Sequence, residues 1–351
     1  MNIASIRLQN FRSYIDASFE FGDRVNIIVG PNGSGKTNLL EAVQVLAIGG
    51  SYRVHDAELV RHGAPWARLD ASLHSGTSMR TMKLLVEPRL TKTFEIQEKP
   101  YSRLTQQHTL PLVLFEPNHL QLLHGAPEIR RSYLDDILEQ TKSGYPSFRR
   151  NYRRVLTQRN ALLKRGHPSV GELFPWNLRL SELGAVIARA RAELVNDIAQ
   201  KLADLYKTLS KSKTVVTLEY EPQFPVESYE TSLLGKLEAA IDRDVARGFT
   251  AYGPHREDMT VKIDGRPAAE VASRGETRTI VLAFKILELE LIEEARGVTP
   301  ILLLDDVFSE LDGARRRALT SYLQAHQTFL TTTDADVVIK HFTDSTILPL
   351  G

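Results

Sequence analysis

The sequence predicts an α/β fold that consists of a head with an antiparallel β layer and an inserted helical lobe. A glycine-rich loop stands between a buried strand and a helix close to residue 30. Strands with alternating apolar residues occur on both sides of this unit, up to about residue 96. From 128 to 213 the periodicity is helical, and strands return after 214.

The composition is that of a folded protein with sizeable cores. The chain has 351 residues, of which 42% are hydrophobic and 25% charged, and this predicts two or three domains or lobes. The absence of cysteine excludes disulfides, cysteine-ligated zinc and thiol catalysis, and it suits a reducing cytoplasm. No apolar run reaches about 18 residues and Arg7 interrupts the start, so we expect a cytoplasmic protein with no signal peptide and no membrane span. Because the net charge is only +1, any DNA-binding surface must come from local clustering of basic residues.

The first part of the chain predicts strands, because apolar and polar residues alternate. Segments 6–8 and 17–21 are joined by residues 10–14 and form an N-terminal hairpin. Segments 67–73, 82–86 and 94–96 are separated by turns and extend an antiparallel sheet layer. A further apolar run, 110–115, ends at Glu116 and Pro117.

The helical lobe ends in one long helix, expected from about 176 to 209, whose apolar residues repeat at helical spacing over roughly 50 Å. Its expected partner is an antiparallel helix over 148–164. Turn signals occur only around 143–146 and 166–175.

The last part of the chain alternates strands and helices. Residues 259–263 lead into Asp264 and Gly265, a strong hairpin signal. A helix is expected over about 276–295, an apolar strand over 301–304, a helix over 314–325 and a strand over 328–332. This order predicts a βαβ-type ending.

The glycine-rich loop fits the phosphate-binding pattern G-x-x-x-x-G-K-[ST] at every position. Lys36 is expected to reach the β and γ phosphates, and Thr37 to place its hydroxyl on Mg²⁺. A chance glycine turn before a helix is the alternative, but the strand over 25–29 and the helix over 38–48 are the context that a nucleotide site requires. The candidate cofactor-binding residues here are Gly30, Pro31, Asn32, Gly33, Ser34, Gly35, Lys36, Thr37 and Asn38.

A second nucleotide motif is predicted where the strand over 301–304 runs into two acids. A buried strand can aim a carboxylate at a Mg²⁺ ion beside a phosphate loop, and we assign Asp305 to this role. Asp306 is then expected to polarise the attacking water, which makes Asp306 and Lys36 the candidate catalytic residues. The alternative is a solvated strand end, and the phosphate loop argues against it.

These motifs resemble those of ABC-type ATPase heads of the SMC kind, and more closely the RecF family of bacterial recombination mediators. The resemblance covers nearly the whole chain. In order, the matching segments are Asn10-Phe11-Arg12, the phosphate loop continued by Asn38-Leu39-Leu40-Glu41-Ala42, Ser51-Tyr52-Arg53, Phe115-Glu116-Pro117, Gly125-Ala126-Pro127 with Arg130-Arg131, Gly253-Pro254-His255-Arg256, Ser273-Arg274-Gly275-Glu276, Leu303-Leu304-Asp305-Asp306 and Ser309-Glu310-Leu311-Asp312.

The resemblance implies an ABC-type P-loop ATPase head that residues 1–127 and 214–351 form together, with 128–213 as the inserted helical lobe. It implies that Ser273, Arg274 and Gly275 are a signature motif, which contacts the γ-phosphate held by another subunit, so that two ATPs join a homodimer. Residues 309–312 are then a D-loop at the same interface, and Arg12 lies near the bound phosphates. In isolation, a Ser-Arg-Gly segment at a helix start is more often a cap.

The sequence departs from the wider ABC pattern at three places. Glu276 stands where the signature usually has glutamine, and Asp306 where transporters have glutamate. Residues 331–333 are threonines at the end of the last predicted strand, where transporters carry a switch histidine. For the glutamine loop, Glu116 and Asn118 are neighbourhood candidates.

The RecF resemblance implies an ATP-gated DNA-binding protein of recombinational repair with a weak, regulatory ATPase. It implies binding to gapped or single-stranded and duplex DNA, and promotion of RecA loading with RecR and RecO. The alternatives are an ABC transporter motor domain and a GTPase. A transporter motor would need a membrane partner and a more compact insert. A GTPase would be expected to carry the guanine-reading sequence Asn-Lys-x-Asp, which does not occur in this chain.

One basic run in the helical lobe is a candidate DNA surface. Residues four apart lie on one side of a helix, so these arginines form a stripe that could track phosphates: Arg149, Arg150, Arg153 and Arg154. The alternative is a solvated helix face.

Overall fold

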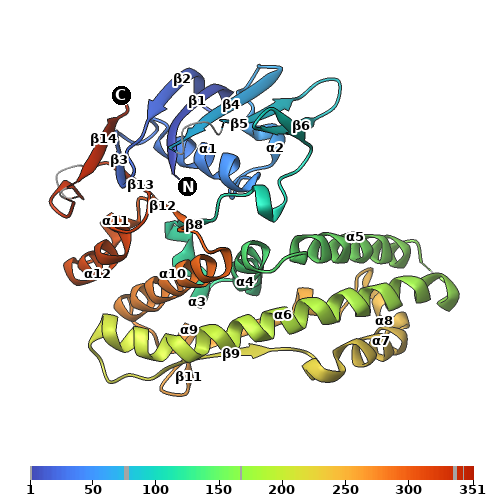
Figure 1. Ribbon diagram of the computed structural model, residues 1–351. Helices are drawn as coiled ribbons and strands as arrows, with labels where there is room; N and C mark the ends of the chain where they lie inside the picture. The colour runs from blue at the N-terminus through green and yellow to red at the C-terminus, as the bar shows by residue number, and fades with distance from the viewer. Residues whose placement is uncertain (1, 75–78, 167, 335–337, 343) are drawn as a thin grey trace. The chain divides into compact units, whose positions relative to one another are not determined.

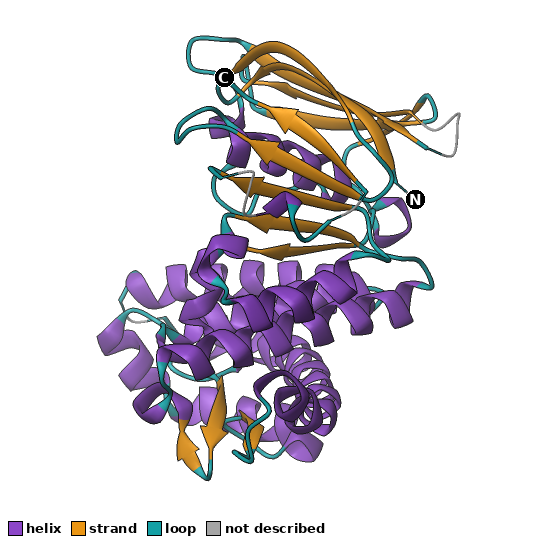
Figure 2. Ribbon diagram, turned by 90° about the vertical axis from the view of Figure 1, so that its left-hand side faces the viewer, coloured by secondary structure: helices purple, strands orange, loops and turns teal. Residues whose placement is uncertain are grey.

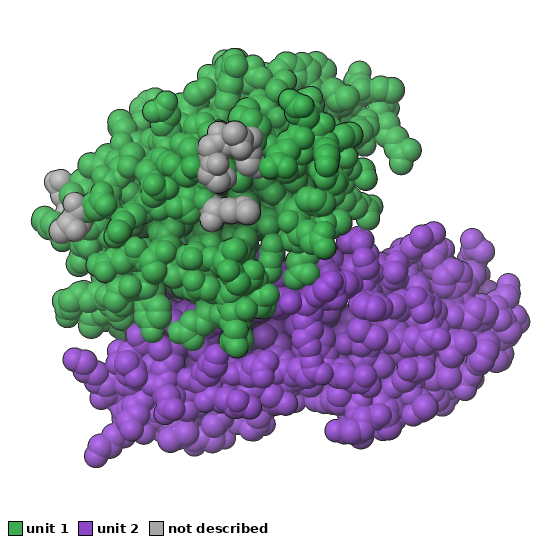
Figure 3. Space-filling view, viewed as in Figure 1, with its two compact units in different colours: residues 1–119, 288–351 green, residues 120–287 purple. Residues whose placement is uncertain are grey.

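The computed structural model describes residues 2–74, 79–166, 168–334, 338–342 and 344–351, with the side chains of Ser309 and Glu310 left out. The described residues form two compact units (Figure 3). Unit 1 contains residues 1–119 and 288–351, and unit 2 contains residues 120–287.

Unit 1 carries an antiparallel sheet whose described strands follow the order β2-β1-β4-β5-β6-β7. The expected N-terminal hairpin is confirmed, because β1 and β2 pair in antiparallel register across the turn at Arg12 and Ser13. In β4 every second residue is buried, which is the alternation that the sequence shows. The strands are β1 (Ile3–Phe11), β2 (Tyr14–Glu20), β4 (Trp66–Leu73), β5 (Met79–Leu85), β6 (Thr91–Ile96) and β7 (Lys99–Tyr101).

Unit 1 also carries a parallel sheet with the order β14-β3-β13-β12-β8. Its strands are short, and all except the edge strand over 345–349 are buried along nearly their whole length, as is typical of a parallel sheet that is covered on both faces. They are β3 (Val25–Val29), β8 (Leu112–Phe115), β12 (Ile301–Asp305), β13 (Thr328–Thr332) and β14 (Ser345–Pro349). The sequence predicted the first four of these segments and missed β14, which pairs with β3 along its whole length.

Helix α1 (Lys36–Ile48) lies between the two sheets of unit 1, as both views show (Figures 1 and 2). It is buried on nearly every side, so its apolar residues join those of β1, β4 and β12 in one core. Gly49 ends the helix in the left-handed conformation, where the sequence places its stop signal. The other helices of unit 1 are α2 (Asp56–Leu59), α11 (Val307–Glu310) and α12 (Gly313–Leu323), with 3₁₀ turns at Gln106–His108 and Pro117–Leu120.

Unit 2 is built around α6 (Val170–Ser210), against which α4, α5, α7 and β9 pack. Its other elements are α3 (Gln121–His124), α4 (Pro127–Thr141), α5 (Tyr145–Lys164), α7 (Tyr229–Ala239), α8 (Ile241–Arg247), α9 (Ala268–Val271), the sheet β9 (Val216–Glu221), β10 (Asp258–Ile263) and β11 (Arg266–Pro267), and 3₁₀ turns at Val226–Ser228 and Pro254–Arg256. Helix α10 (Arg274–Arg296) begins in unit 2 and ends in unit 1.

The long helix α6 begins six residues earlier than the sequence predicts, at Val170 instead of 176. Ser169 and Glu172 form a capping box, which satisfies the free N–H groups of the first turn. Pro175 lies inside the helix, where it cannot donate a hydrogen bond to the carbonyl of Gly171, four residues earlier. The cap therefore outweighs the proline as a boundary signal.

Unit 2 extends beyond the helical lobe expected over 128–213, from Leu120 to Leu287. The physical reason is that β9 and α7, which follow the lobe in the sequence, pack onto α6. The segment 214–287 was expected to belong to the head, and it clusters instead with the lobe.

Candidate functional site

The phosphate-loop pattern lies where the sequence predicts, between β3 and α1. Gly33 and Gly35 have φ angles of 85° and 100°, which side-chain-bearing residues rarely adopt. A Cβ atom on Gly35 would lie 2.9 Å from the hydroxyl of Tyr14, which itself donates a hydrogen bond to the Gly35 carbonyl at 3.1 Å. The hairpin residue Tyr14 therefore packs directly on the loop and requires glycine there.

The Lys36 side chain is buried and folds back over the loop. Its Nζ donates to the carbonyl oxygens of Gly30 at 2.7 Å and Pro31 at 3.0 Å. These carbonyls hold the ammonium group above the start of α1, where N–H groups and the helix dipole favour an anion.

The two predicted halves of the site meet in unit 1. The Thr37 hydroxyl donates to Asp305 Oδ1 at 3.1 Å, although 268 residues separate them in the chain. Asp305 ends β12, and the parallel register with β13 and β3 brings the carboxyl ends of these strands to one edge. A hydroxyl and a carboxylate side by side are oxygen ligands of the kind that Mg²⁺ takes, so the donor set fits this ion.

Asp306 follows Asp305 directly in the chain and has a left-handed backbone conformation, with a φ angle of 52°. Burial, together with the neighbouring Asp305 charge, raises the pKa of its carboxyl, and Lys36 opposes this shift. Its backbone N–H donates to the Thr331 hydroxyl at 2.9 Å. Lys36, Asp305 and Asp306 are therefore electrostatically coupled, as one site requires.

Sequence reasoning did not assign a role to Tyr52 or Thr331 at this site. The Tyr52 hydroxyl donates to Asp305 Oδ2 at 3.3 Å, and the Thr331 hydroxyl donates to Asp305 Oδ1 at 2.8 Å. Burial, and then the Asp305 charge, raise the pKa of Tyr52, so it remains a donor. The available signals were the Ser51-Tyr52-Arg53 segment and the threonine run at the end of β13.

Arg12 lies at the turn of the N-terminal hairpin with φ 50°. Its Nε forms an ion pair with the fully buried Glu41 at 2.9 Å, and a terminal nitrogen donates to the Glu58 carbonyl at 3.0 Å. Asn38 donates to Ser13 in the same turn at 2.9 Å. Arg12 and Asn38 thus fasten the hairpin turn to α1, and their expected contact with phosphates remains a prediction.

The signature segment begins α10 in unit 2. Ser273 and Glu276 form a reciprocal cap: the Ser273 hydroxyl and N–H donate to the Glu276 carboxylate at 2.7 and 2.9 Å, and the Glu276 N–H donates to the Ser273 hydroxyl at 3.2 Å. Arg274 is exposed and Gly275 is half-buried. The segment therefore caps a helix and also presents an exposed serine, which is compatible with both interpretations of the sequence.

For the expected D-loop and glutamine loop, the structure describes contacts of only some of the residues. In the D-loop, the side chains of Ser309 and Glu310 lie outside the described residues, whereas Asp312 caps α12 through a 3.0 Å bond from the Arg315 N–H. Of the glutamine-loop candidates, Glu116 follows β8 and its charge acts on Tyr52, whereas no contact between Asn118 and another described residue identifies a role.

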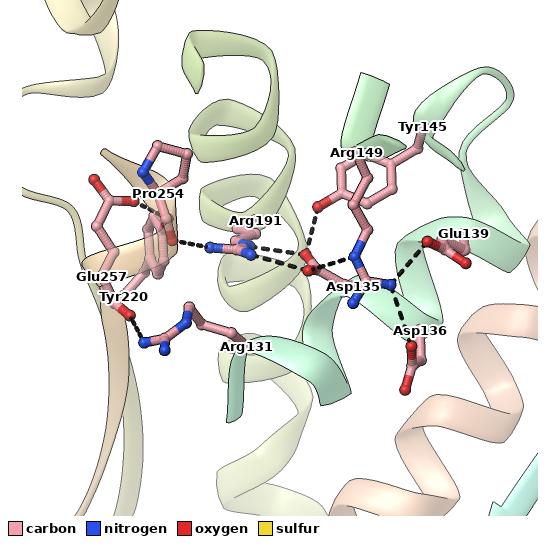
Figure 4. Close-up of polar contacts among 10 residues, drawn as sticks. All are labelled: Arg131, Asp135, Asp136, Glu139, Tyr145, Arg149, Arg191, Tyr220, Pro254 and Glu257. Atoms are coloured by element: carbon pink, nitrogen blue, oxygen red, sulfur yellow. Dashed lines mark hydrogen bonds and ion pairs between the residues drawn. The ribbon is translucent and has the colours of Figure 1, made fainter. Parts of the chain in front are cut away.

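The predicted arginine stripe is wrong at Arg149. This side chain is buried, and it pairs with Asp135 at 2.9 Å, Glu139 at 2.8 Å and Asp136 at 3.5 Å (Figure 4). The acids of α4 neutralise its charge and cover it, so it cannot track phosphates. The other members of the stripe are exposed on α5: Arg150, Arg153 and Arg154.

Arg149 belongs to a buried polar network of unit 2 (Figure 4). Asp135 also accepts from Tyr145 at 2.6 Å and from two nitrogens of Arg191 at 2.9 and 3.0 Å. Arg191 in turn donates to the Pro254 carbonyl at 2.6 Å. The network thus ties α4, α5 and α6 to the Gly253-Pro254-His255-Arg256 corner. Burial lowers the pKa of His255 to about 4, so this histidine is a neutral, structural residue.

Among the described residues, no helix is long and apolar enough to cross a bilayer. The described residues also contain no cluster of three or more histidine or acidic side chains that could hold a metal ion by itself.

Comparison with known proteins agrees with this architecture. Residues 2–347 match the family model described as RecF/RecN/SMC N terminal domain. The chain is 35% identical over 347 residues to the DNA replication and repair protein RecF of Synechococcus sp. (strain JA-3-3Ab), covering 95% of this chain and 91% of the relative. It is 36% identical over 344 residues to the RecF protein of Heliobacterium modesticaldum, covering 95% and 92%.

Solved structures lead to the same family. A structure of the recombination mediator protein RecF-ATPrS in the RecFOR pathway superposes with a TM-score of 0.87 at 27% identity, covering 95% of this chain and 93% of that chain. An Smc head bound to the C-winged helix domain of ScpA, at 15% identity and a TM-score of 0.53, shares the fold. The chain therefore belongs to the RecF family of DNA replication and repair proteins, with the fold of the SMC-type ATPase heads.

Proposed function

We propose that this protein is a slow, Mg²⁺-dependent ATPase that uses ATP to form a DNA-binding homodimer in recombinational repair. The observation that carries the ATPase is the 3.1 Å contact between Thr37 and Asp305. Two predicted motifs, from opposite ends of the chain, come together at this contact. RecF structures described with ATP and ATPrS support the choice of nucleotide.

Each residue of the site has a distinct task in this proposal. The loop N–H groups and Lys36 bind the phosphates, and Lys36 leaves its loop carbonyls to do so. Thr37 and Asp305 hold Mg²⁺, which supplies neutralising charge at the β and γ phosphates. Asp306 orients the attacking water and accepts its proton, and a raised carboxyl pKa favours this role.

The homodimer rests on the signature segment. The positive end of the α10 dipole and the exposed Ser273 are suited to the γ-phosphate held by a second copy. ATP would then be bound between two chains, and hydrolysis would release them. We expect the ATPase to be a regulatory switch with slow turnover.

DNA binding rests on the family and on the exposed arginines of α5. Arg150, Arg153 and Arg154 present positive charge to solvent. The relatives are named DNA replication and repair proteins, and one is described as a recombination mediator of the RecFOR pathway. We infer that the dimer binds gapped, single-stranded and duplex DNA in the cytoplasm and promotes RecA loading with RecR and RecO.

Nucleotide gating is tested by size-exclusion chromatography with ADP, ATP or a non-hydrolysable analogue, with and without gapped DNA. The wild type should dimerise with ATP and the analogue only. Lys36→Ala should stay monomeric and folded, and Asp306→Asn should accumulate a long-lived ATP dimer. An ATP-induced dimer of Lys36→Ala would refute the assignment of the phosphate site.

A shared site predicts complementation. A Lys36→Ala subunit and a Ser273→Arg subunit can together build one intact site, whereas neither mutant can do so alone. Mixing them should restore part of the ATPase activity. Heterodimers that form without any rescue would argue against a site made by two chains.

The DNA surface is tested by the triple change of Arg150, Arg153 and Arg154 to glutamine. Each lost phosphate contact should reduce the magnitude of the slope of log affinity against log salt by roughly 0.9 on duplex DNA. The slope of the triple variant should therefore be smaller in magnitude by about 2.7 than that of the wild type. The matched control removes three exposed positive charges from α6: Arg179, Arg189 and Lys207. An unchanged slope in the triple variant, or an equal change in the control, would place the DNA surface elsewhere.

A further inference from the structure

The two acids at the end of β12 are connected through one buried hydroxyl group. Thr331 is the penultimate residue of β13, in register with Asp305, and its side chain is fully buried. Its Oγ1 lies 2.8 Å from Asp305 Oδ1 and 2.9 Å from the backbone nitrogen of Asp306. Because a backbone N–H can only donate, the hydroxyl accepts from Asp306 and directs its own proton to Asp305.

This arrangement fixes a backbone conformation that needs support. Asp306 has a φ angle of 52°, in the left-handed region that L-residues other than glycine rarely adopt. The bond to Thr331 holds the Asp306 N–H at the point where the chain leaves β12 for α11. Strain of this kind persists where surrounding contacts enforce it, and it is concentrated at functional sites.

Asp305 is held on both sides by hydroxyl groups. Thr37 donates to the same oxygen as Thr331, at 3.1 Å, and Tyr52 donates to the other oxygen at 3.3 Å. Removing Thr331 leaves these two donors in place. The loss would therefore act mainly on the geometry of Asp306 relative to Asp305.

The next threonine provides an internal comparison. Thr332 is also nearly fully buried at the end of β13, but its hydroxyl bonds to the backbone of Asp334, at 3.1 Å as donor and 3.1 Å as acceptor. Thr332 thus stabilises the turn after the strand, and both hydrogen bonds described for its hydroxyl go to Asp334 and not to Asp305 or Asp306. The two neighbours differ in what they touch, and only slightly in burial.

From this geometry we infer that Thr331 is a positioning residue for ATP hydrolysis, which couples the metal-side acid Asp305 to the water-orienting acid Asp306. The inference rests on the proposed ATPase function. Its role would be to set the Asp306 backbone, and with it the carboxylate, at a fixed place relative to the Asp305 carboxylate.

The test compares Thr331→Val with Thr332→Val, because each change removes one buried hydroxyl at nearly constant volume. Thr331→Val should lower kcat for ATP at least about tenfold and change KM less than about threefold, since the phosphate loop is untouched. Thr331→Ser should restore kcat to within about threefold of the wild type, because it restores the hydroxyl. Thr332→Val should keep the wild-type kcat.

A binding measurement separates positioning from loss of the site. Anisotropy of a fluorescent ATP analogue in Mg²⁺ should give dissociation constants within about threefold for the wild type and the Thr331 variants. Wild-type kcat or lost analogue binding in Thr331→Val, no recovery in Thr331→Ser, or an equal fall in Thr332→Val would overturn the inference.

Two outcomes need their own controls. If circular dichroism shows that Thr331→Val is unfolded, Thr331→Ala and Thr331→Ser replace it, since they differ only by the hydroxyl. Equal kcat in that pair overturns the inference. A wild-type protein that neither binds nor hydrolyses ATP refutes the ATPase function itself, so the two failures are distinguishable.

Discussion

Replacing Arg149 by glutamine should destabilise unit 2, because it removes the central cation of a buried network. Its guanidinium pairs with three carboxylates of α4, and its side chain is only 11% exposed. Breaking a buried ion pair by removing one partner costs about 3–5 kcal/mol. Asp135 keeps its bonds to Arg191 and Tyr145 in the variant, so no buried carboxylate is left alone. We therefore expect the free energy of unfolding to fall by about 3 kcal/mol, at the low end of this range.

The assay uses the two tryptophans of the chain. Trp66 lies in unit 1 and Trp176 in unit 2, so a Trp66→Phe background makes fluorescence report on unit 2. Trp66 is 36% exposed, and the replacement keeps an aromatic ring there. With a urea slope of about 3 kcal/mol per molar, a loss of about 3 kcal/mol lowers the midpoint by about 1 M.

The matched control is Arg153→Gln, one helical turn later on α5 and exposed. Surface changes of this kind stay within about 0.5 kcal/mol, so its midpoint should not move measurably. Equal midpoints for Arg149→Gln and Arg153→Gln would show that the ion pairs of Arg149 contribute nothing, and the network would lose its structural role.

Burial would raise the pKa of Asp135, but the flanking arginines outweigh it and lower that pKa. A carboxyl whose pKa is lowered in the folded state stabilises the fold at pH values above its unfolded pKa near 3.8, and this stabilisation is lost as the pH falls through the lowered pKa. Asp135→Asn lacks this stabilisation, so its acid unfolding, followed by Trp176 fluorescence, should begin at less acidic pH. Glu276→Gln should strengthen ATP-induced dimerisation severalfold by sedimentation, because it removes a carboxylate that holds the Ser273 hydroxyl and would repel phosphates; weaker dimerisation would contradict this. Gly35→Ala should abolish binding of a fluorescent ATP analogue, since its Cβ would lie 2.9 Å from the Tyr14 hydroxyl in a left-handed conformation, and unchanged binding would refute the loop geometry.

The phosphate and metal residues could be predicted because their chemistry requires a fixed local order. Strand, glycine loop and helix specify Lys36 and Thr37, and an apolar strand ending in acids specifies Asp305. Thr331 carries no such signal, because a threonine at the end of a strand is ordinary in any sheet. Its role depends on the register between β12 and β13, which is a tertiary property.

Helical periodicity placed Arg149 on the wrong side of its helix. Spacing shows which residues share a face, but not what that face meets. Buried arginines are almost always paired, and the acids that pair with Arg149 lie on the preceding helix α4. The strand β14 was missed for a similar reason, since a short apolar segment gains its structure from pairing with β3.

The order of strands in the parallel sheet has a consequence for how the protein is made. The phosphate-loop strand β3 is flanked by β13 and β14, which the ribosome adds last. Thr37 can contact Asp305 only after 268 further residues have been synthesised. At about 5–20 residues per second, this synthesis takes roughly a quarter of a minute to a minute. Unit 2, which is continuous in sequence, can fold during that interval. The nascent chain thus carries a phosphate loop that lacks its acidic partner for most of translation, and a ribosome that stalls before β12 leaves a product without the metal-side acid.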